Sequence, residues 1–193
     1  MTKTKFLYSL IFALALLAPS TVLAQRDFLT PEEIEIVRDS QEIDTRIDVL
    51  TQAIDRRFSV LNLDVSAPKV KAKGEWGELP KGTRPELLLD IKRLLQKAVD
   101  DIDNLAERPN SAVIPDPEKR KGDTSFASLF PRAVRNLAAA ATRYVPVLKS
   151  QLDLVGNNSE KGSILDSLDL CKQIIDSVAK LPAEAAKKSG KKT

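Results

Sequence analysis

Apolar residues recur at intervals of three, four and seven positions along this chain, and this periodicity constrains the fold more than any other feature. The first stripe consists of Ile36, Ile43, Ile47, Leu50, Ile54 and Leu61. Residues at these intervals lie on one face of an α-helix. No stretch of comparable length alternates apolar and polar residues as a half-buried strand does. The sequence therefore predicts an all-α protein.

Capping-box motifs mark where two of the helices begin. Thr30 and Glu33 have the spacing at which each side chain caps the backbone N–H of the other residue. The apolar stripe that follows predicts one continuous helix over residues 30–61, about nine turns long. The same motif recurs at Thr83, and the stripe behind it predicts a second helix over residues 84–107.

Two further helices are predicted at residues 124–155 and 159–181, separated by a turn that is rich in glycine and asparagine. Pro131 and Pro146 lie inside the first of these two segments. Proline has no backbone N–H, and its ring collides with the carbonyl group four residues earlier. We therefore expect a break near Pro131 and a kink near Pro146.

Four amphipathic helices have to bury their apolar stripes against one another. We therefore expect an antiparallel up-down four-helix bundle over residues 25–181, with one long inter-helix loop at 62–83. In this order of helices, the 62–83 loop shares one end of the bundle with the 156–158 turn. The 108–122 loop and both chain ends share the other.

The first residues have the features of an export signal. Lys3 and Lys5 precede the apolar run Phe6–Ala18, and small residues follow as far as Ala24. We predict a signal peptide over residues 1–24, cleaved after Ala24, which places the mature protein in the periplasm or outside the cell. Retention of the signal as an anchor is the alternative. A membrane span needs about 20 apolar residues, so we expect no transmembrane segment in the mature chain.

Charge and cysteine content bear on partners and on stability. The formal net charge of +3 falls to +1 without the two lysines of the predicted signal peptide. Nucleic-acid binding calls for a concentrated basic face, so we expect no nucleic-acid partner. The single cysteine, Cys171, cannot form an intrachain disulfide and lies on an apolar stripe. We interpret it as a buried thiol that packs as a small hydrophobic side chain.

The chain contains no histidine. This excludes Ser-His-Asp and Cys-His nucleophilic sites, histidine-ligated haem, zinc sites that need histidine, and the Glu-x-x-His motif of di-iron bundles. Asp100, Asp101 and Asp103 form the densest acidic cluster, which we interpret as a solvated helix face because a calcium loop has a different spacing. We predict a non-enzymatic protein without metal or cofactor; a carboxylate-based enzyme is a remote alternative.

The 62–83 segment is the first candidate site, because a loop of that length without structure is often functional. Its candidate partner-binding residues are Trp76, Leu79, Lys69, Lys71 and Lys73. Tryptophan is enriched in the residues that dominate binding energy at interfaces. The alternative is that Trp76 and Leu79 fold back as a lid over the open end of the bundle.

Basic residues near the opposite end form the second candidate site. They are Lys119, Arg120 and Lys121, close to a lysine-rich tail at 182–193 that we expect to be disordered. Such a group of cations would attract a polyanion, such as anionic lipid or an envelope polymer. The alternative is a solubilising tail beside a solvated loop.

Two stretches carry a resemblance to known sequences. Residues 29–34, Leu-Thr-Pro-Glu-Glu-Ile, continue to Arg-Asp-Ser-Gln-Glu at 38–42, and Leu-Pro-Lys-Gly-Thr-Arg-Pro-Glu-Leu-Leu follows at 79–88. With these motifs the chain resembles an uncharacterised group of exported helical proteins of environmental bacteria. The resemblance covers most of the mature chain and implies an exported helical fold, but it implies no activity.

These observations favour an exported, non-enzymatic helical-bundle protein that binds a partner in the cell envelope, either an unknown protein or a polyanion. The alternative is a structural protein that oligomerises through a helix face. That alternative predicts apolar side chains left outside the main stripes, such as Val37, Val49 and Leu88.

Overall fold

The computed structural model describes residues 26–67, 74–113 and 123–181, and within these ranges it is all-helical. The α-helices are α2 (Pro31–Asp39), α3 (Ile43–Val60), α4 (Arg84–Glu107), α5 (Phe126–Leu152) and α6 (Asn158–Ser177). Short 3₁₀ turns are η1 (Gly74–Trp76), η2 (Pro109–Ser111) and η3 (Val178–Lys180). The predicted signal peptide at 1–24 and the tail at 182–193 lie outside the described residues. The predicted all-α class is confirmed for the rest.

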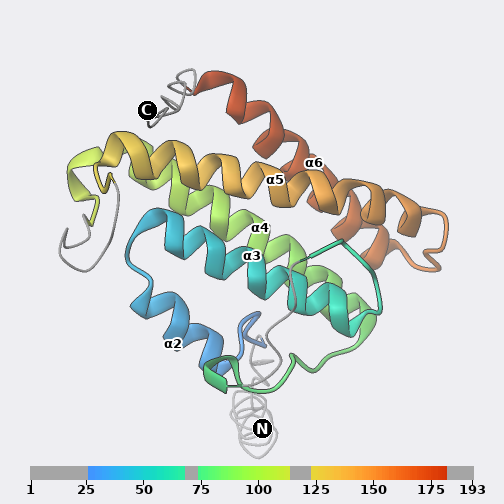
Figure 1. Ribbon diagram of the computed structural model, residues 1–193. Coiled ribbons are helices and arrows are strands. Elements are labelled where there is room, and N and C mark those ends of the chain that lie inside the picture. The colour runs from blue at the N-terminus through green and yellow to red at the C-terminus, as the bar shows by residue number, and fades with distance from the viewer. Residues whose placement is uncertain (1–25, 68–73, 114–122, 182–193) are drawn as a thin grey trace, which may run out of the picture.

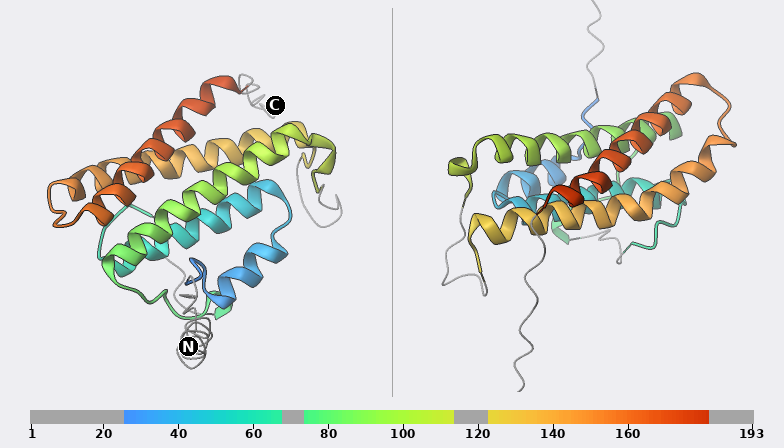
Figure 2. Two further views of the ribbon diagram at one scale, coloured as in Figure 1. Left: turned by 180° about the vertical axis from the view of Figure 1, so that it is seen from behind. Right: turned by 90° about the horizontal axis from the view of Figure 1, so that it is seen from above.

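The long helices pack in three layers (Figures 1 and 2). α4 and α5 each contact both α3 and α6, so α3 covers one side of this pair and α6 covers the other. Successive helices from α3 to α6 alternate in direction. α2 lies on the outer side of α3 and also contacts η1. Among the described residues, no helix has the length and apolar content needed to cross a membrane.

The core lies between α3, α4, α5 and α6. Its fully buried side chains include Ile47, Leu50, Ile54, Ile91, Leu94, Leu137, Tyr144, Leu148, Ile164 and Cys171. Alanines of α5 contribute little bulk, and Ala133, Ala140 and Ala141 are buried there. Small side chains of this kind let neighbouring helices approach closely, which suits the packing of α5 against both α3 and α6.

Both capping boxes are present. The hydroxyl of Thr30 accepts a hydrogen bond from the backbone N–H of Glu33 at 3.2 Å, and the Glu33 carboxylate accepts one from the N–H of Thr30 at 3.0 Å. At the start of α4, the N–H of Thr83 donates to the Glu86 carboxylate at 2.6 Å. This bond lowers the pKa of Glu86. α4 then occupies the range predicted for the second helix.

The prediction of one continuous helix over residues 30–61 is wrong, because α2 ends at Asp39 and α3 begins at Ile43. Ser40, with φ of −83° and ψ of 80°, leaves the helical conformation. A continuous helix would hold Glu33 and Arg57, 24 residues apart, at a separation of about 36 Å. Instead, their side chains form a hydrogen bond of 2.6 Å. The chain therefore folds back, and α2 lies against α3.

Arg46 stabilises this corner. Its Nε donates to the Asp101 carboxylate on α4 at 2.8 Å, and its Nη1 lies 3.4 Å and 3.5 Å from the carbonyl oxygens of Val37 and Ser40. The last carbonyl groups of a helix have no partner within the helix, and a cation at that end also interacts favourably with the helix dipole. One arginine of α3 therefore joins the end of α2 to α4.

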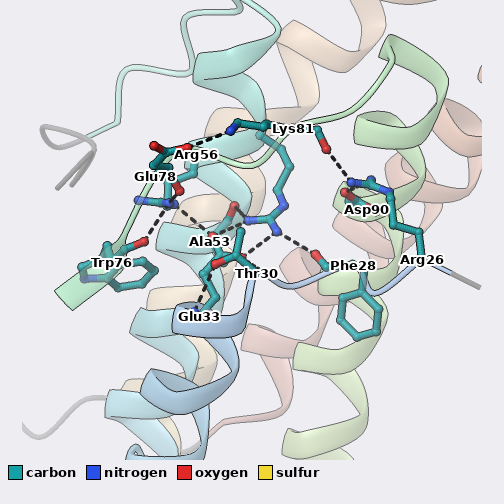
Figure 3. A network of polar contacts seen from close by, with 11 residues as sticks. Arg26, Phe28, Thr30, Glu33, Ala53, Arg56, Trp76, Glu78, Lys81 and Asp90 are labelled. Atoms are coloured by element: carbon teal, nitrogen blue, oxygen red, sulfur yellow. Dashed lines mark hydrogen bonds and ion pairs between the residues drawn. The ribbon is translucent and has the colours of Figure 1, made fainter. Parts of the chain in front are cut away.

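A buried ionic cluster holds α2 on α3 (Figure 3). Glu33, Arg56 and Arg57 are each at most 1% exposed. The Glu33 carboxylate accepts hydrogen bonds from Arg56 Nε at 2.9 Å and from both terminal nitrogens of Arg57 at 2.6 Å. Two cations face one anion, so part of the positive charge has to be stabilised by other groups.

Backbone carbonyl groups supply that stabilisation. Arg57 donates to the carbonyls of Phe28 at 2.7 Å and Ala53 at 2.8 Å. Arg56 donates to the carbonyl of Trp76 at 2.9 Å and to that of Glu78. The cluster thus ties the segment before α2 and the segment after η1 to the same two side chains of α3.

A second ion pair fixes the start of the described chain. Arg26 donates to the Asp90 carboxylate of α4 at 2.5 Å and to the carbonyl of Lys81 at 2.6 Å. The Asp90 side chain is buried, and burial raises its pKa although Arg26 and Arg57 oppose that effect. Arg26 thus supplies a counter-ion to a carboxylate that is otherwise shielded from water.

The predicted break at Pro131 is also wrong, because α5 continues from Phe126 through both prolines to Leu152. Pro131 is in the second turn, where the missing N–H would have bonded the carbonyl of Ala127. Ala127 is exposed, so water can satisfy that carbonyl. The kink expected near Pro146 stays a prediction.

The apolar residues that the oligomerising alternative placed outside the main stripes are in the core. Val37, Val49 and Leu88 are all buried, so they offer no exposed apolar face for oligomerisation. For Val37 on α2 and Val49 on α3, the reason is the fold-back of α2 onto α3. The large apolar side chains that are exposed in the described ranges are Val113 after η2, Leu154 after α5 and Leu165 in α6, three separate places in the chain.

We predict that Glu33→Gln lowers the free energy of unfolding by about 3–5 kcal/mol, because it leaves two buried guanidinium groups without a counter-ion. Glutamine keeps the capping-box bond, so the effect reports on the ionic cluster. Urea denaturation followed by circular dichroism measures it. Glu35→Gln, at an exposed carboxylate of the same helix paired with Arg38, is the control and is expected to cost less than about 1 kcal/mol. Equal effects of the two variants would contradict the role of the cluster.

Candidate functional site

The predicted site residues divide into two groups. Trp76 and Leu79 are described, whereas the predicted cations Lys69, Lys71, Lys73, Lys119, Arg120 and Lys121 lie outside the described residues. The structure therefore does not test the basic candidate site near the 108–122 loop. It does place the tryptophan, which carried most of the argument for the 62–83 segment.

Trp76 is only 1% exposed, and Leu79 is half-buried. The guanidinium of Arg56 lies 5.5 Å from the centre of the indole ring, a cation–π arrangement. The lid alternative predicted that this segment covers the end of the bundle. η1 instead lies beside α2. The indole ring is therefore packed inside the protein. Trp76 is not exposed for binding as the first interpretation required.

Gly77 allows η1 to approach α2 this closely. Its φ of 58° lies in the left-handed region, which favours glycine. A Cβ atom at this position would lie 2.7 Å from Cδ of Glu32 on α2. The Gly-Glu-Trp-Gly sequence thus forms a tight turn pressed against α2.

A groove of about 620 Å³ lies between α2 and α3 and is bounded by this turn. Its apolar lining residues are Ile36, Val49 and Trp76; Ile36 is half-buried, whereas Val49 and Trp76 are buried. Val113, which follows η2 and is exposed, lies at its edge. The volume is within the range of about 300–1,000 Å³ that is typical of ligand sites in proteins. The fold-back of α2 therefore creates a concave surface that one continuous helix could not have made.

All charged side chains among the described residues that line this groove are acidic. Its charged members are Asp39, Glu42, Asp48 and Glu75, and its uncharged polar members are Ser40, Gln41, Thr45 and Gln52. No lysine or arginine is among the described residues that line it. The groove therefore combines apolar residues with amides, hydroxyls and carboxylates. Glu42, Asp48 and Glu75 also interact with other groups of the chain. A lining whose charged described residues are all acidic suits a ligand that carries positive charge. We call it the acidic groove.

A different polar cluster is buried between α3 and α5. The Tyr144 hydroxyl lies 2.8 Å from an Asp55 carboxylate oxygen, to which it donates, and 3.2 Å from the carbonyl of Thr51. Arg143 contacts the same carboxylate at 3.3 Å and donates to the carbonyl of Val65 at 3.1 Å. Burial raises the pKa of Asp55, although Tyr144 and Arg143 oppose the shift, and burial raises the pKa of Tyr144.

A buried carboxylate with a raised pKa is common in active sites, but it also occurs in structural networks. Asp55 and Tyr144 do not line the acidic groove, and their partners are an arginine and backbone carbonyls. Their visible effect is to fasten the segment after α3 to α5. Sequence reasoning missed this cluster, because it joins residues 55 and 144, which are 89 positions apart in the chain.

Within the described ranges, no group of three or more acidic or cysteine side chains gathers as metal ligands do. In the Asp100–Asp103 region, Asp101 pairs with Arg46 at 2.8 Å and with Lys97 at 2.5 Å. Asp100 accepts a hydrogen bond from Gln96 at 2.8 Å. These carboxylates are therefore engaged by neighbouring side chains on and beside α4.

Cys171 is completely buried on α6. Burial raises the pKa of its thiol to about 12, so the reactive thiolate is almost absent at neutral pH. The thiol therefore packs as an apolar side chain in this structure.

Comparison with known proteins found no matching family model, no similar curated protein and no similar solved structure. The chemistry of the acidic groove has to be argued from its own side chains.

We predict that the stability of the protein relative to Asp55→Asn falls as pH rises above 3.8, the ordinary pKa of aspartate. The folded state raises the pKa of Asp55, so it retains a proton that the unfolded chain loses, and rising pH favours the unfolded chain until the folded-state pKa is passed. Urea denaturation at a series of pH values measures the difference. Asp169→Asn, at an exposed carboxylate on α6, is the control. If the stability of the unchanged protein relative to Asp55→Asn rose with pH, the raised pKa of Asp55 would be contradicted.

We predict that Cys171 reacts with thiol reagents at neutral pH only as fast as the protein unfolds, because the group is buried and protonated. Labelling should be complete in concentrated guanidinium. A Leu165→Cys variant in a Cys171→Ala background puts an exposed thiol on the same helix and should react rapidly without denaturant. Rapid labelling of Cys171 in the folded protein would show that the site opens.

Proposed function

We propose that this chain is an exported, non-enzymatic helical-bundle protein that acts by binding a partner in the cell envelope through the acidic groove. In this proposal, α3 to α6 form an antiparallel up-down four-helix bundle and α2 is an additional helix that builds the groove. The packing of α4 and α5 against both α3 and α6, with alternating helix directions, supports that arrangement. Export is proposed from the signal-like residues 1–24 alone.

The observation that carries the proposal is the acidic groove itself. It brings α2 and α3 together with η1 and the segment after η2, which are distant from them in sequence. It also includes Glu75 and Trp76 of the 62–83 segment, which sequence reasoning singled out. Concave surfaces with an apolar wall and a few polar groups are the usual sites of ligand binding.

The charge of the lining defines the partner. Every charged side chain that the described residues contribute to the groove is a carboxylate. Across an interface, surfaces of opposite charge steer association and discriminate between partners. We therefore propose that the partner is a protein that places a segment rich in lysine and arginine in the groove, with a small apolar side chain against Ile36 and Val49.

The tryptophan has a supporting role in this proposal. Because its ring is buried and its carbonyl is bound by Arg56, Trp76 holds the wall of the groove in place. Contacts with the partner would come from the exposed rim, where Asp39, Thr45 and Glu75 are accessible. Replacing Trp76 would therefore unsettle the fold and would not isolate binding.

The three alternatives gain no support of their own. Oligomerisation through Val37, Val49 or Leu88 is not favoured, because all three are buried within one chain. Binding of a polyanion through Lys119, Arg120 and Lys121 stays a prediction, because those residues lie outside the described ranges. A carboxylate-based enzyme would need two accessible acidic residues, one acting as general acid and one as general base. Asp55 has a pKa raised by burial, but it is enclosed between helices and is not accessible to a substrate.

We predict that the mature protein binds a lysine-rich peptide more tightly than a glutamate-rich peptide of equal length, and that salt weakens this binding. Asp39→Lys should weaken it by roughly fivefold or more, since it reverses a charge at the groove. Asp39 is the last residue of α2, where a cation suits the helix dipole, so folding is preserved. Fluorescence anisotropy of labelled peptides measures the affinity.

The control is Glu35→Lys, which makes the same change of charge at an exposed position of α2 that does not line the groove. It should leave peptide affinity within about twofold of the unchanged protein, the scale of a distant surface charge. Equal weakening by the two variants would show a general charge effect, and equal affinity for the two peptides would reject the proposed partner.

A further inference from the structure

A second concave surface lies on the other side of the molecule, between α4, α5 and the C-terminal half of α6. Its volume is about 310 Å³. α6 crosses α4 and α5 obliquely, as the view from above in Figure 2 shows, so the three helices do not stay in contact along their whole length. The concavity is separate from the acidic groove, because the two have no lining residue in common.

The inner surface of this pocket is aliphatic. Val134, Leu137 and Ile174 are buried at its base, and Val99 and Ile102 are half-buried on its α4 side. Apolar surface that is left partly in contact with water gains about 25 cal/mol per Å² when a ligand covers it. The base therefore suits an aliphatic group and offers no hydrogen-bonding side chain to a polar one.

The mouth of the pocket is polar and carries more negative than positive charge. Asp103 and Asp176 contribute two carboxylates, and Lys180 contributes one ammonium group. The Ser177 hydroxyl donates to the carbonyl of Ile174 at 2.7 Å, so the oxygen that it presents is an acceptor. Two carboxylates against one ammonium leave a net charge of −1, which favours a cationic group at the mouth.

We propose that this pocket binds a single-chain amphiphile with a cationic head group. The aliphatic chain lies against Leu137, Val134 and Ile174, and the ammonium group lies at the mouth between Asp103 and Asp176. The volume is at the lower limit of the range of about 300–1,000 Å³ for ligand sites, so it accommodates one short chain and not a two-chain lipid. This inference is independent of the proposed function of the acidic groove.

The test uses the mature chain, residues 25–193, and isothermal titration with octyltrimethylammonium below its micelle concentration. Octyl sulfate and octyl glucoside supply the same chain with an anionic and a neutral head. The cationic amphiphile is expected to bind, and to bind at least about fivefold more tightly than either of the others. Absence of binding, or equal or tighter binding of octyl sulfate, would overturn the proposal.

Two sets of variants locate the ligand. The double variant Asp103→Asn with Asp176→Asn should lose most of the preference for the cationic head. The control, Asp100→Asn with Asp169→Asn on the same two helices outside the pocket, should keep it.

A second pair of variants tests the volume of the pocket. Val99→Trp should fill the pocket and abolish binding, whereas Gln96→Trp, at an exposed position of α4, should leave binding unchanged. Circular dichroism confirms that each variant is folded. Equal effects of the pocket and control variants would place binding elsewhere and reject this site.

Discussion

One buried carboxylate, that of Glu33, determines where α2, the segment before it and η1 lie. Its two arginine partners come from α3, so α2 can satisfy them only by folding back along that helix. The same arginines hold the carbonyls of Phe28, Trp76 and Glu78, which places the N-terminal segment and η1 beside α2. The acidic groove is a consequence of this arrangement, because its walls are the elements that the cluster brings together.

The capping signals in the sequence were reliable, whereas the break expected at Pro131 was not. The capping boxes at Thr30 and Thr83 are formed, and α4 has the range that its apolar stripe predicted. The turn between α2 and α3 was not predictable in this way, since Ile36 and Ile43 are seven residues apart and keep the helical period across the break. The decisive interactions join residues more than 20 positions apart, and periodicity does not register them.

The candidate site was predictable only in part, for the same reason. The length of the 62–83 segment and its tryptophan drew attention to a segment that borders the acidic groove. They did not indicate whether Trp76 is exposed, because that depends on its contacts with Arg56, 20 positions earlier in the chain. The acids that line the groove come from two helices and a turn, and nothing in their spacing relates Asp39 to Glu75.

The ion pair between Arg26 and Asp90 limits how far the chain can be shortened from its N-terminus. Cleavage at the predicted position, after Ala24, would leave only Gln25 in front of Arg26. Removal of two more residues would take away the cation that accompanies a carboxylate buried on α4. A shortened version of the chain therefore has to begin at or before Arg26 to keep the counter-ion of Asp90.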